Sequence, residues 1–153
     1  MIRFLIAYEN VVFDGQPQYL KDELSFYYKP WRTVDFSILI DDGHNSLDVE
    51  LENGRVLQVT GPNPDYNWIK KQLFVPTFQR GSLMVLFDRK YQGGTGIQYA
   101  KEWQTYFDDK TGCVCIGNTE CDSNCIGVEF AKNTVAVVDN EQLSSVWIKP
   151  QFI

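Results

Sequence analysis

The feature that most constrains the fold is an Asn-Gly pair between two segments of alternating polarity. Residues 46–60 read Ser-Leu-Asp-Val-Glu-Leu-Glu-Asn-Gly-Arg-Val-Leu-Gln-Val-Thr, with Asn53 and Gly54 at the centre. A two-residue type I′ turn needs positive φ at both turn positions, which Asn and Gly tolerate. The pattern therefore predicts a tight hairpin in which Glu52 faces Arg55. The acidic side chains expected on its polar face are Asp48, Glu50 and Glu52.

Further segments also have the apolar content or the alternation of β-strands. They are Ile2–Tyr8, Thr33–Ile40, Ser82–Phe87, Gly112–Ile116, Gly127–Phe130, Thr134–Val138 and Leu143–Lys149. We expect the first segment to be a buried strand. The last three segments are expected to form a closing meander whose final turn falls at residues 139–142.

Helical signals are fewer than strand signals. Pro17–Phe26 begins with a proline and places two leucines four residues apart. Pro64–Leu73 has a proline at a suitable first position, an early acid and two late lysines, which is the polarity that a helix dipole favours. Ile97–Phe107 fits helix or strand. The expected fold class is α+β, a single domain over residues 1–153 with a largely antiparallel meander sheet and two or three short helices.

Charge limits the classes of partner. The chain has 20 acidic and 14 basic residues, a net charge of −6, and the acids are concentrated in residues 1–52. Such a protein repels phosphate backbones, so we expect no direct binding to nucleic acid, whereas a basic protein would be attracted. Ordinary solubility is the alternative reason for this acidity. No apolar run is long enough for a membrane span, and the apolar run at the N-terminus is too short for a signal peptide, so we expect no membrane contact and a cytoplasmic location.

All the cysteines lie close together in the sequence. Cys113, Cys115, Cys121 and Cys125 have the spacing C-x-C-x5-C-x3-C. In a strand, the first two would point to the same face and could hold one metal ion with the other two, and four thiolates would favour zinc. Zinc sites more often use C-x2-C. Two other interpretations are disulfide bonds and free thiols packed as small apolar groups.

No set of residues indicates catalysis. His44, the single histidine, lies in an Asp-Asp-Gly-His-Asn run typical of a turn, and no nucleophile can be assigned to it. The glycines of residues 93–96 lack the lysine of a phosphate-binding loop. An enzyme that uses His44 with a carboxylate is therefore the least favoured hypothesis, and we expect a protein without catalytic activity.

The C-terminal third resembles a known family. The segments are Cys115-Ile-Gly117, Val128-Glu-Phe-Ala131, Asn133-Thr-Val-Ala-Val-Val-Asp139 and Val146-Trp-Ile-Lys-Pro150. This hairpin pattern looks like the small bacterial immunity proteins of contact-dependent and other polymorphic toxin systems. The resemblance implies a small, acidic, cytoplasmic protein that binds and blocks one cognate toxin domain, often a basic nuclease. It implies no particular binding residues.

These observations together predict a binding protein that covers the basic active-site surface of a toxin with its own acidic face. The residues expected to contact the partner are Asp41, Asp42, Asp48, Glu50 and Glu52, with the aromatic side chains of Tyr27, Tyr28 and Trp31 as anchors or as core residues. No cofactor is expected for this function. The alternative is a structural or adaptor domain stabilised by zinc at the four cysteines.

Overall fold

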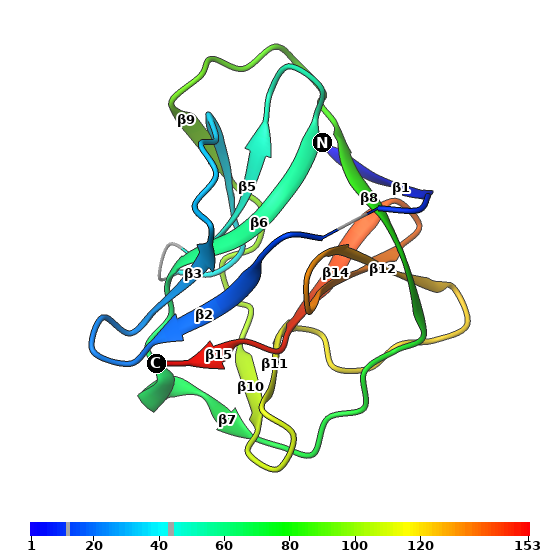
Figure 1. Cartoon of the computed structure of the whole chain (residues 1–153). Helices are drawn as coiled ribbons and strands as arrows, with labels where there is room; N and C mark the ends of the chain where they lie inside the picture. The colour runs from blue at the N-terminus through cyan, green and yellow to red at the C-terminus, as the bar shows by residue number, and fades with distance from the viewer. Residues whose placement is uncertain (12, 43–44) are drawn as a thin grey trace.

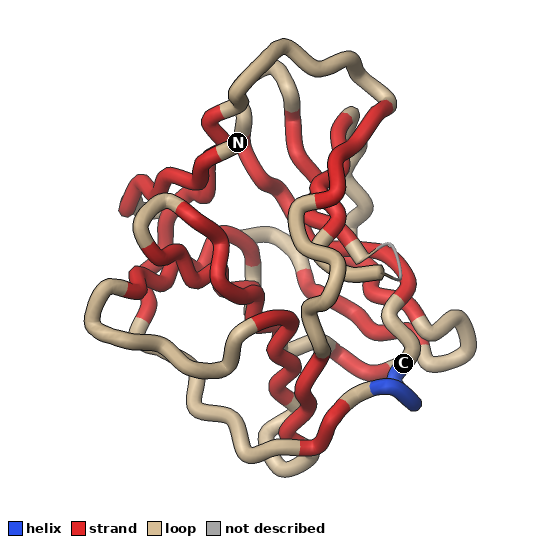
Figure 2. Tube along the Cα trace, turned by 180° about the vertical axis from the view of Figure 1, so that it is seen from behind, coloured by secondary structure: helices blue, strands red, loops and turns tan. Residues whose placement is uncertain are grey.

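The computed structural model describes residues 1–11, 13–42 and 45–153. In these residues nearly all regular structure is β, as Figures 1 and 2 show. The strands are β1 (Arg3–Tyr8), β2 (Gln16–Leu20), β3 (Ser25–Lys29), β4 (Phe36–Leu39), β5 (Ser46–Glu50), β6 (Arg55–Pro62), β7 (Ile69–Lys70), β8 (Phe78–Leu86), β9 (Thr95–Gln98), β10 (Thr105–Asp108), β11 (Cys113–Gly117), β12 (Cys125–Ala131), β13 (Thr134–Asp139), β14 (Gln142–Ile148) and β15 (Gln151–Phe152).

The predicted α+β class is wrong, because the expected helices are strands and turns. Pro17–Phe26 forms β2, a turn and the start of β3. The buried residues of β2, Pro17 and Tyr19, follow the strand period of two, and Phe26 of β3 pairs with Tyr19. Pro64–Leu73 contains only the short 3-10 helix η1 (Asp65–Asn67) and β7. Leu20 and Leu24 alone were too few apolar residues to define a helical stripe.

The strands join into one mixed sheet that curls upon itself (Figure 1). Its main path runs β15-β2-β3-β6-β8-β12-β13-β14-β11-β10-β7, and β5, β4 and β9 extend from β6. Among the described residues, strand β1 pairs only with β8. Most pairs are antiparallel, and the parallel ones are β7 with β10, β8 with β12, β2 with β15 and β4 with β9. The predicted closing meander is confirmed as β12, β13 and β14.

The predicted hairpin at residues 46–60 forms, but its turn is not type I′. Glu50, rather than Glu52, pairs with Arg55, which leaves a four-residue connection, residues 51–54. Only Gly54 in this turn has positive φ, at 73°, and its N–H donates to the carbonyl of Glu50 at 2.8 Å. The two-residue turn with two positive φ values lies instead between β13 and β14, at Asn140 and Glu141.

The C-terminal sheet is buried on both faces, because its strands separate two apolar clusters. Val114 and Ile116 of β11 join the main core, whereas Cys113 and Cys115 join a smaller cluster on the opposite face. Strands β13 and β14 alternate in the same way, and Trp147 belongs to the smaller cluster. In the described residues, no helix is long and apolar enough to cross a membrane.

Candidate functional site

The predicted acidic residues do not share one surface. In the register of the β4–β5 hairpin, Phe36 pairs with Val49 and Leu39 with Ser46. Asp41 and Asp42 follow one end of β4, while Glu50 and Glu52 lie at the opposite end of the hairpin. The five predicted carboxylates are therefore divided among two depressions and the interior.

Asp48 is an interior residue, and its assignment to a partner surface was wrong. Its side chain is 3% exposed. Ser46 Oγ donates to its Oδ1 at 3.0 Å, while Gln58 Nε2 and Thr60 Oγ1 donate to its Oδ2 at 3.0 and 2.6 Å. Burial raises the Asp48 pKa above its usual value, and the three hydrogen bonds oppose this rise. The polar side of the hairpin is thus a buried hydrogen-bonded cluster.

One group of carboxylates does gather at the surface, at the tip of the β5–β6 hairpin. Asp35, Glu50 and Glu52, which we call the acidic hairpin tip, line a depression of about 190 Å³. Asp35 Oδ1 accepts a hydrogen bond from the N–H of Leu51 at 2.9 Å, which joins the segment before β4 to the turn. In the part of the chain that the structure describes, none of the three forms an ion pair. Their charge is therefore available to a basic partner.

Asp41 and Asp42 border a separate depression of about 320 Å³, together with Trp68 and Trp103. Asp41 is 8% exposed, and its Oδ1 accepts a hydrogen bond from the N–H of Asn45 at 2.9 Å, so its carboxylate has a structural role. Asp42 is exposed. The catalytic hypothesis for His44 lies outside the described residues.

The predicted aromatic anchors are likewise divided between the interior and the surface. Tyr28 is 2% exposed, and its hydroxyl oxygen accepts a hydrogen bond from the N–H of Lys132 at 3.3 Å. Tyr28 is therefore a core residue. Trp31 is 59% exposed, and its ring lies 6.2 Å from that of half-buried Tyr27. Of the three aromatic residues, Tyr27 and Trp31 remain accessible to a partner.

The four cysteines do not form one metal site in the described residues, and all four are free thiols. Cys113 and Cys115 are 5% and 0% exposed and pack against Leu73 and Trp147. Burial raises the pKa of Cys113 to about 11 and also raises that of Cys115. The first two residues of the predicted zinc site are thus part of an apolar cluster.

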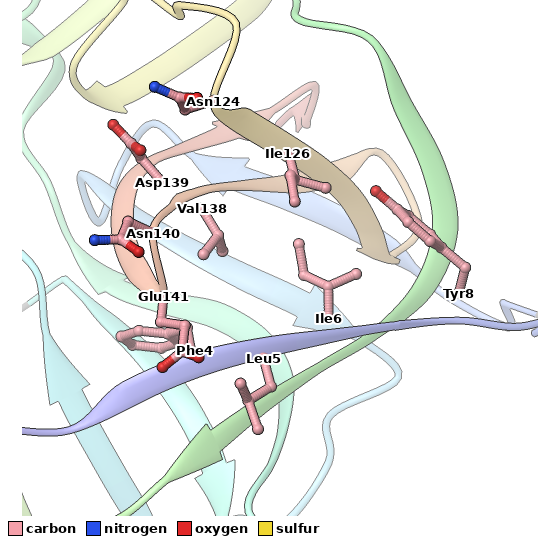
Figure 3. Close-up of a pocket in the computed structure, with 10 residues that line it drawn as sticks. All are labelled: Phe4, Leu5, Ile6, Tyr8, Asn124, Ile126, Val138, Asp139, Asn140 and Glu141. Atoms are coloured by element: carbon pink, nitrogen blue, oxygen red, sulfur yellow. The ribbon is translucent and has the colours of Figure 1, made fainter.

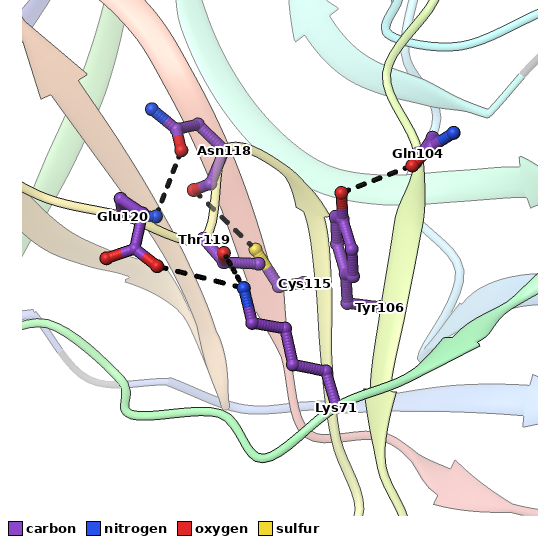
Figure 4. Close-up of polar contacts among 7 residues, drawn as sticks. All are labelled: Lys71, Gln104, Tyr106, Cys115, Asn118, Thr119 and Glu120. Atoms are coloured by element: carbon purple, nitrogen blue, oxygen red, sulfur yellow. Dashed lines mark hydrogen bonds and ion pairs between the residues drawn. The ribbon is translucent and has the colours of Figure 1, made fainter.

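Polar contacts above Cys115 hold the loop that follows β11 (Figure 4). Lys71 Nζ donates to Thr119 Oγ1 at 2.7 Å and lies 3.7 Å from Glu120 Oε1. The Cys115 thiol lies 3.9 Å from the carbonyl oxygen of Asn118. These contacts place the loop over the thiol, and the Lys71 ammonium group acts on Cys115 as a nearby positive charge.

The other two cysteines lie among carboxylates. Cys121 is exposed and Cys125 is half-buried. One ligand atom each from Asp122, Cys125 and Asp139 lies within 4.8 Å of the others, so these three residues could hold a metal ion. Partial desolvation, followed by the neighbouring Cys125 thiol, raises the pKa of Cys121 to about 12. The sequence pattern did not predict this set, because Asp139 comes from the far end of β13.

A groove of about 690 Å³ opens between β1 and the β12–β13 hairpin (Figure 3). One end is closed by a hydrogen bond from the N–H of Phe4 to the carbonyl of Glu141 at 2.8 Å. The other end is closed by the Tyr8 hydroxyl, which donates to the carbonyl of Gly127 at 3.2 Å. Sequence reasoning missed this groove because it treated Ile2–Tyr8 as a buried strand, whereas Leu5 and Tyr8 are 40% and 49% exposed.

A scan against protein-family models finds no family that matches the chain, and a search of curated proteins finds no matching relative.

Proposed function

We propose that this protein is a non-catalytic binding protein that neutralises a cognate bacterial toxin domain by covering its basic surface. The observation that carries the proposal is the acidic hairpin tip, where Asp35, Glu50 and Glu52 line one depression without a compensating ion pair among the described residues. These carboxylates would lie where nucleic-acid phosphates lie in a nuclease toxin. The proposed place of action is the cytoplasm.

The resemblance to immunity proteins supports the same proposal. Its segments lie on β11, β12, β13 and β14, which are four neighbouring strands of the sheet. The partner surface proposed here lies elsewhere, at the β5–β6 hairpin. Immunity proteins of one fold could then differ in their hairpin tips and bind different toxins, since specificity depends on the site and not on the fold.

The direct test is protection in cells. The polypeptide encoded immediately upstream is expressed with and without this protein, and growth is followed. We expect growth arrest without the protein and rescue with it. Rescue should weaken for Glu50→Lys/Glu52→Lys and persist for Asp22→Lys/Glu23→Lys, which changes the net charge equally at another exposed site.

Two results would oppose the proposal. If the upstream product arrests growth and the protein does not restore it, the protein does not neutralise that product. If both charge-reversed variants rescue as well as the wild type, the acidic hairpin tip is not the partner surface. The melting temperatures of both variants must first match, because Glu50→Lys places a lysine opposite Arg55 and costs up to about 1 kcal/mol.

A zinc-stabilised structural domain remains the second candidate, and Asp122, Cys125 and Asp139 are the residues that favour it. The site differs from the four-cysteine site of the sequence prediction. Metal content of the purified protein, measured by mass spectrometry, tests it: zinc that is lost in Asp139→Asn and kept in Cys113→Ser would support the site. Protein that carries no zinc after purification in zinc-containing buffer would contradict it.

A further inference from the structure

The outer edge of β1 presents backbone groups that pair with no other strand of the described structure. β1 pairs with β8 alone, from Arg3 opposite Leu86 to Tyr8 opposite Gly81. Along an antiparallel strand, successive residues direct their N–H and C=O groups alternately toward and away from the partner strand. The pairing on β8 therefore occupies only every second residue of β1.

The direction of this alternation is fixed at both ends of β1. The N–H of Phe4 donates to Glu141, which lies away from β8. The carbonyl oxygen of Ala7 lies against Gly81 of β8, so close that a Cβ atom at residue 81 would clash with it. The backbone N–H and C=O groups of Phe4, Ile6 and Tyr8 are therefore directed away from β8. Those that point toward the groove are the carbonyl of Phe4, both groups of Ile6 and the N–H of Tyr8.

The floor of the groove is apolar. Ile6, Ile126 and Val138 line it from three different strands, and Figure 3 shows their side chains directed into the space between β1 and β12. Ile126 is 49% exposed. An extended segment paired to β1 would direct alternate side chains onto this floor and exclude water from it.

The charge at one end of the groove indicates the chemistry of the occupant. Asp139 lines the groove beside the β13–β14 turn, and Asp122 lies within 4.8 Å of it. Neither carboxylate forms an ion pair among the described residues, whereas Glu141 in the same turn is paired with Arg3 at 2.8 Å. A lysine or arginine of the occupant could pair with these two carboxylates.

We propose that the β1–β12 groove binds an extended segment of a partner protein, which adds as a strand to the outer edge of β1. The segment has apolar side chains at alternate positions and a basic residue at the end that lies beside Asp139. This surface is separate from the acidic hairpin tip, and the inference does not depend on the partner being a toxin.

The test uses the full chain, labelled with ¹⁵N, and a short synthetic peptide in which two lysines precede alternating valine and threonine. In the free protein, the amide hydrogens of Ile6 and Tyr8 should exchange faster than those of Leu5 and Ala7, which face β8. Millimolar peptide should shift the resonances of Ile6, Tyr8 and Ile126 and slow the exchange of the Ile6 amide.

Substitutions at Ile6 and Asp139, and a peptide of opposite charge, distinguish strand addition from other modes of binding. Ile6→Pro removes the outward N–H, and its affinity for the peptide should fall about tenfold. Ile6→Val keeps this N–H and loses only one methylene from the groove floor, so its affinity should fall about twofold or less. Asp139→Asn should weaken binding of the lysine peptide several-fold. A peptide with glutamates in place of the lysines should bind the wild type several-fold more weakly than the lysine peptide.

Four outcomes would overturn the proposal. They are equal exchange rates along β1, peptide-induced shifts confined to other strands, no shift at millimolar peptide, and a dimer in solution that protects the Ile6 amide without peptide. The last outcome would mean that a second copy of the chain occupies the edge. Loss of toxin protection with the peptide result intact would contradict only the proposed function.

Discussion

Replacement of Asp48 by alanine should strongly destabilise the protein, although the sequence pattern makes this residue look like a surface acid. Its three hydrogen-bond donors belong to Ser46, Gln58 and Thr60, which are 6%, 0% and 7% exposed. A buried donor that loses its acceptor costs about 1–3 kcal/mol. Three such donors give a loss of about 3 kcal/mol or more in the free energy of unfolding.

Asp48→Asn provides a sharper comparison, because it preserves shape and removes the charge. The new Nδ2 would lie against Gln58 Nε2, which is also a donor. Rotation of the Gln58 amide would place Oε1 there as an acceptor instead. In the described structure this buried oxygen has no hydrogen-bond partner. The Thr60 hydroxyl can turn to accept. We therefore expect Asp48→Asn to cost about 1 kcal/mol at neutral pH, well below the cost of alanine.

The pH dependence gives an independent check on the same carboxyl group. Burial raises the Asp48 pKa in the folded protein above its ordinary value of 3.8, so folding favours the protonated form. The stability contributed by this effect is fully present below 3.8 and is lost as the pH rises through the raised pKa. Asparagine does not titrate, so the stability of Asp48→Asn does not fall in this way. The difference in the free energy of unfolding between the wild type and Asp48→Asn should therefore shrink as the pH rises from 3.8 through the raised pKa.

Urea unfolding at several pH values measures both effects, with Glu52→Ala as the exposed control, expected to change stability by about 0.5 kcal/mol or less. The reasoning would be refuted if Asp48→Ala were as stable as Glu52→Ala, because Asp48 would then be solvated. A difference between wild type and Asp48→Asn that does not vary with pH would refute the raised pKa.

Two other features can be tested by substitution and labelling. Gly54→Val should lower stability by about 2 kcal/mol, since a Cβ atom there would lie 2.6 Å from the carbonyl oxygen of Val85 at a φ of 73°. Gly94 has a similar φ of 81°, but no atom lies within 4 Å of an added Cβ, so Gly94→Val should lower the melting temperature less. If both variants lose the same stability, the close contact with Val85 is not what destabilises Gly54→Val. Cys121 and Cys125 are accessible, so a thiol reagent should modify them in the folded protein, slowly at Cys121 because its pKa is raised to about 12. The two cysteines of β11 should react only after denaturation, and rapid modification of all four would contradict the buried cluster.

The sequence predicted strands best where apolar residues alternate. Phe36, Ile38 and Ile40 are buried as expected, and the closing meander forms close to its predicted bounds. The type I′ turn was placed at Asn53-Gly54, but a bulge between Asp48 and Val49 shifts the register. The turn also contacts β8, where the N–H of Val85 donates to the carbonyl of Gly54 at 2.7 Å, and local sequence does not report such a long-range contact.

The candidate site was harder to predict than the strands, because burial depends on the whole sheet. Asp48 and Cys115 lie on strand faces that would be exposed in an isolated hairpin or meander. In the folded chain, other segments cover those faces, so polar Asp48 becomes a hydrogen-bonded interior group and Cys115 becomes part of an apolar cluster. Glu50 and Glu52 remain at the surface because they lie at the end of the hairpin.

The association rate with the cognate toxin domain tests the central proposal most directly. Stopped-flow association is measured at low and high salt for the wild type, Glu50→Lys/Glu52→Lys and Asp22→Lys/Glu23→Lys, and both variants carry a net charge of −2 instead of −6. We expect the first variant to associate about tenfold more slowly at low salt, with a smaller deficit at high salt, and the second to remain near the wild-type rate. Equal slowing of both variants would mean that net charge alone steers the encounter, and an unchanged rate for Glu50→Lys/Glu52→Lys would contradict the acidic hairpin tip as the partner surface.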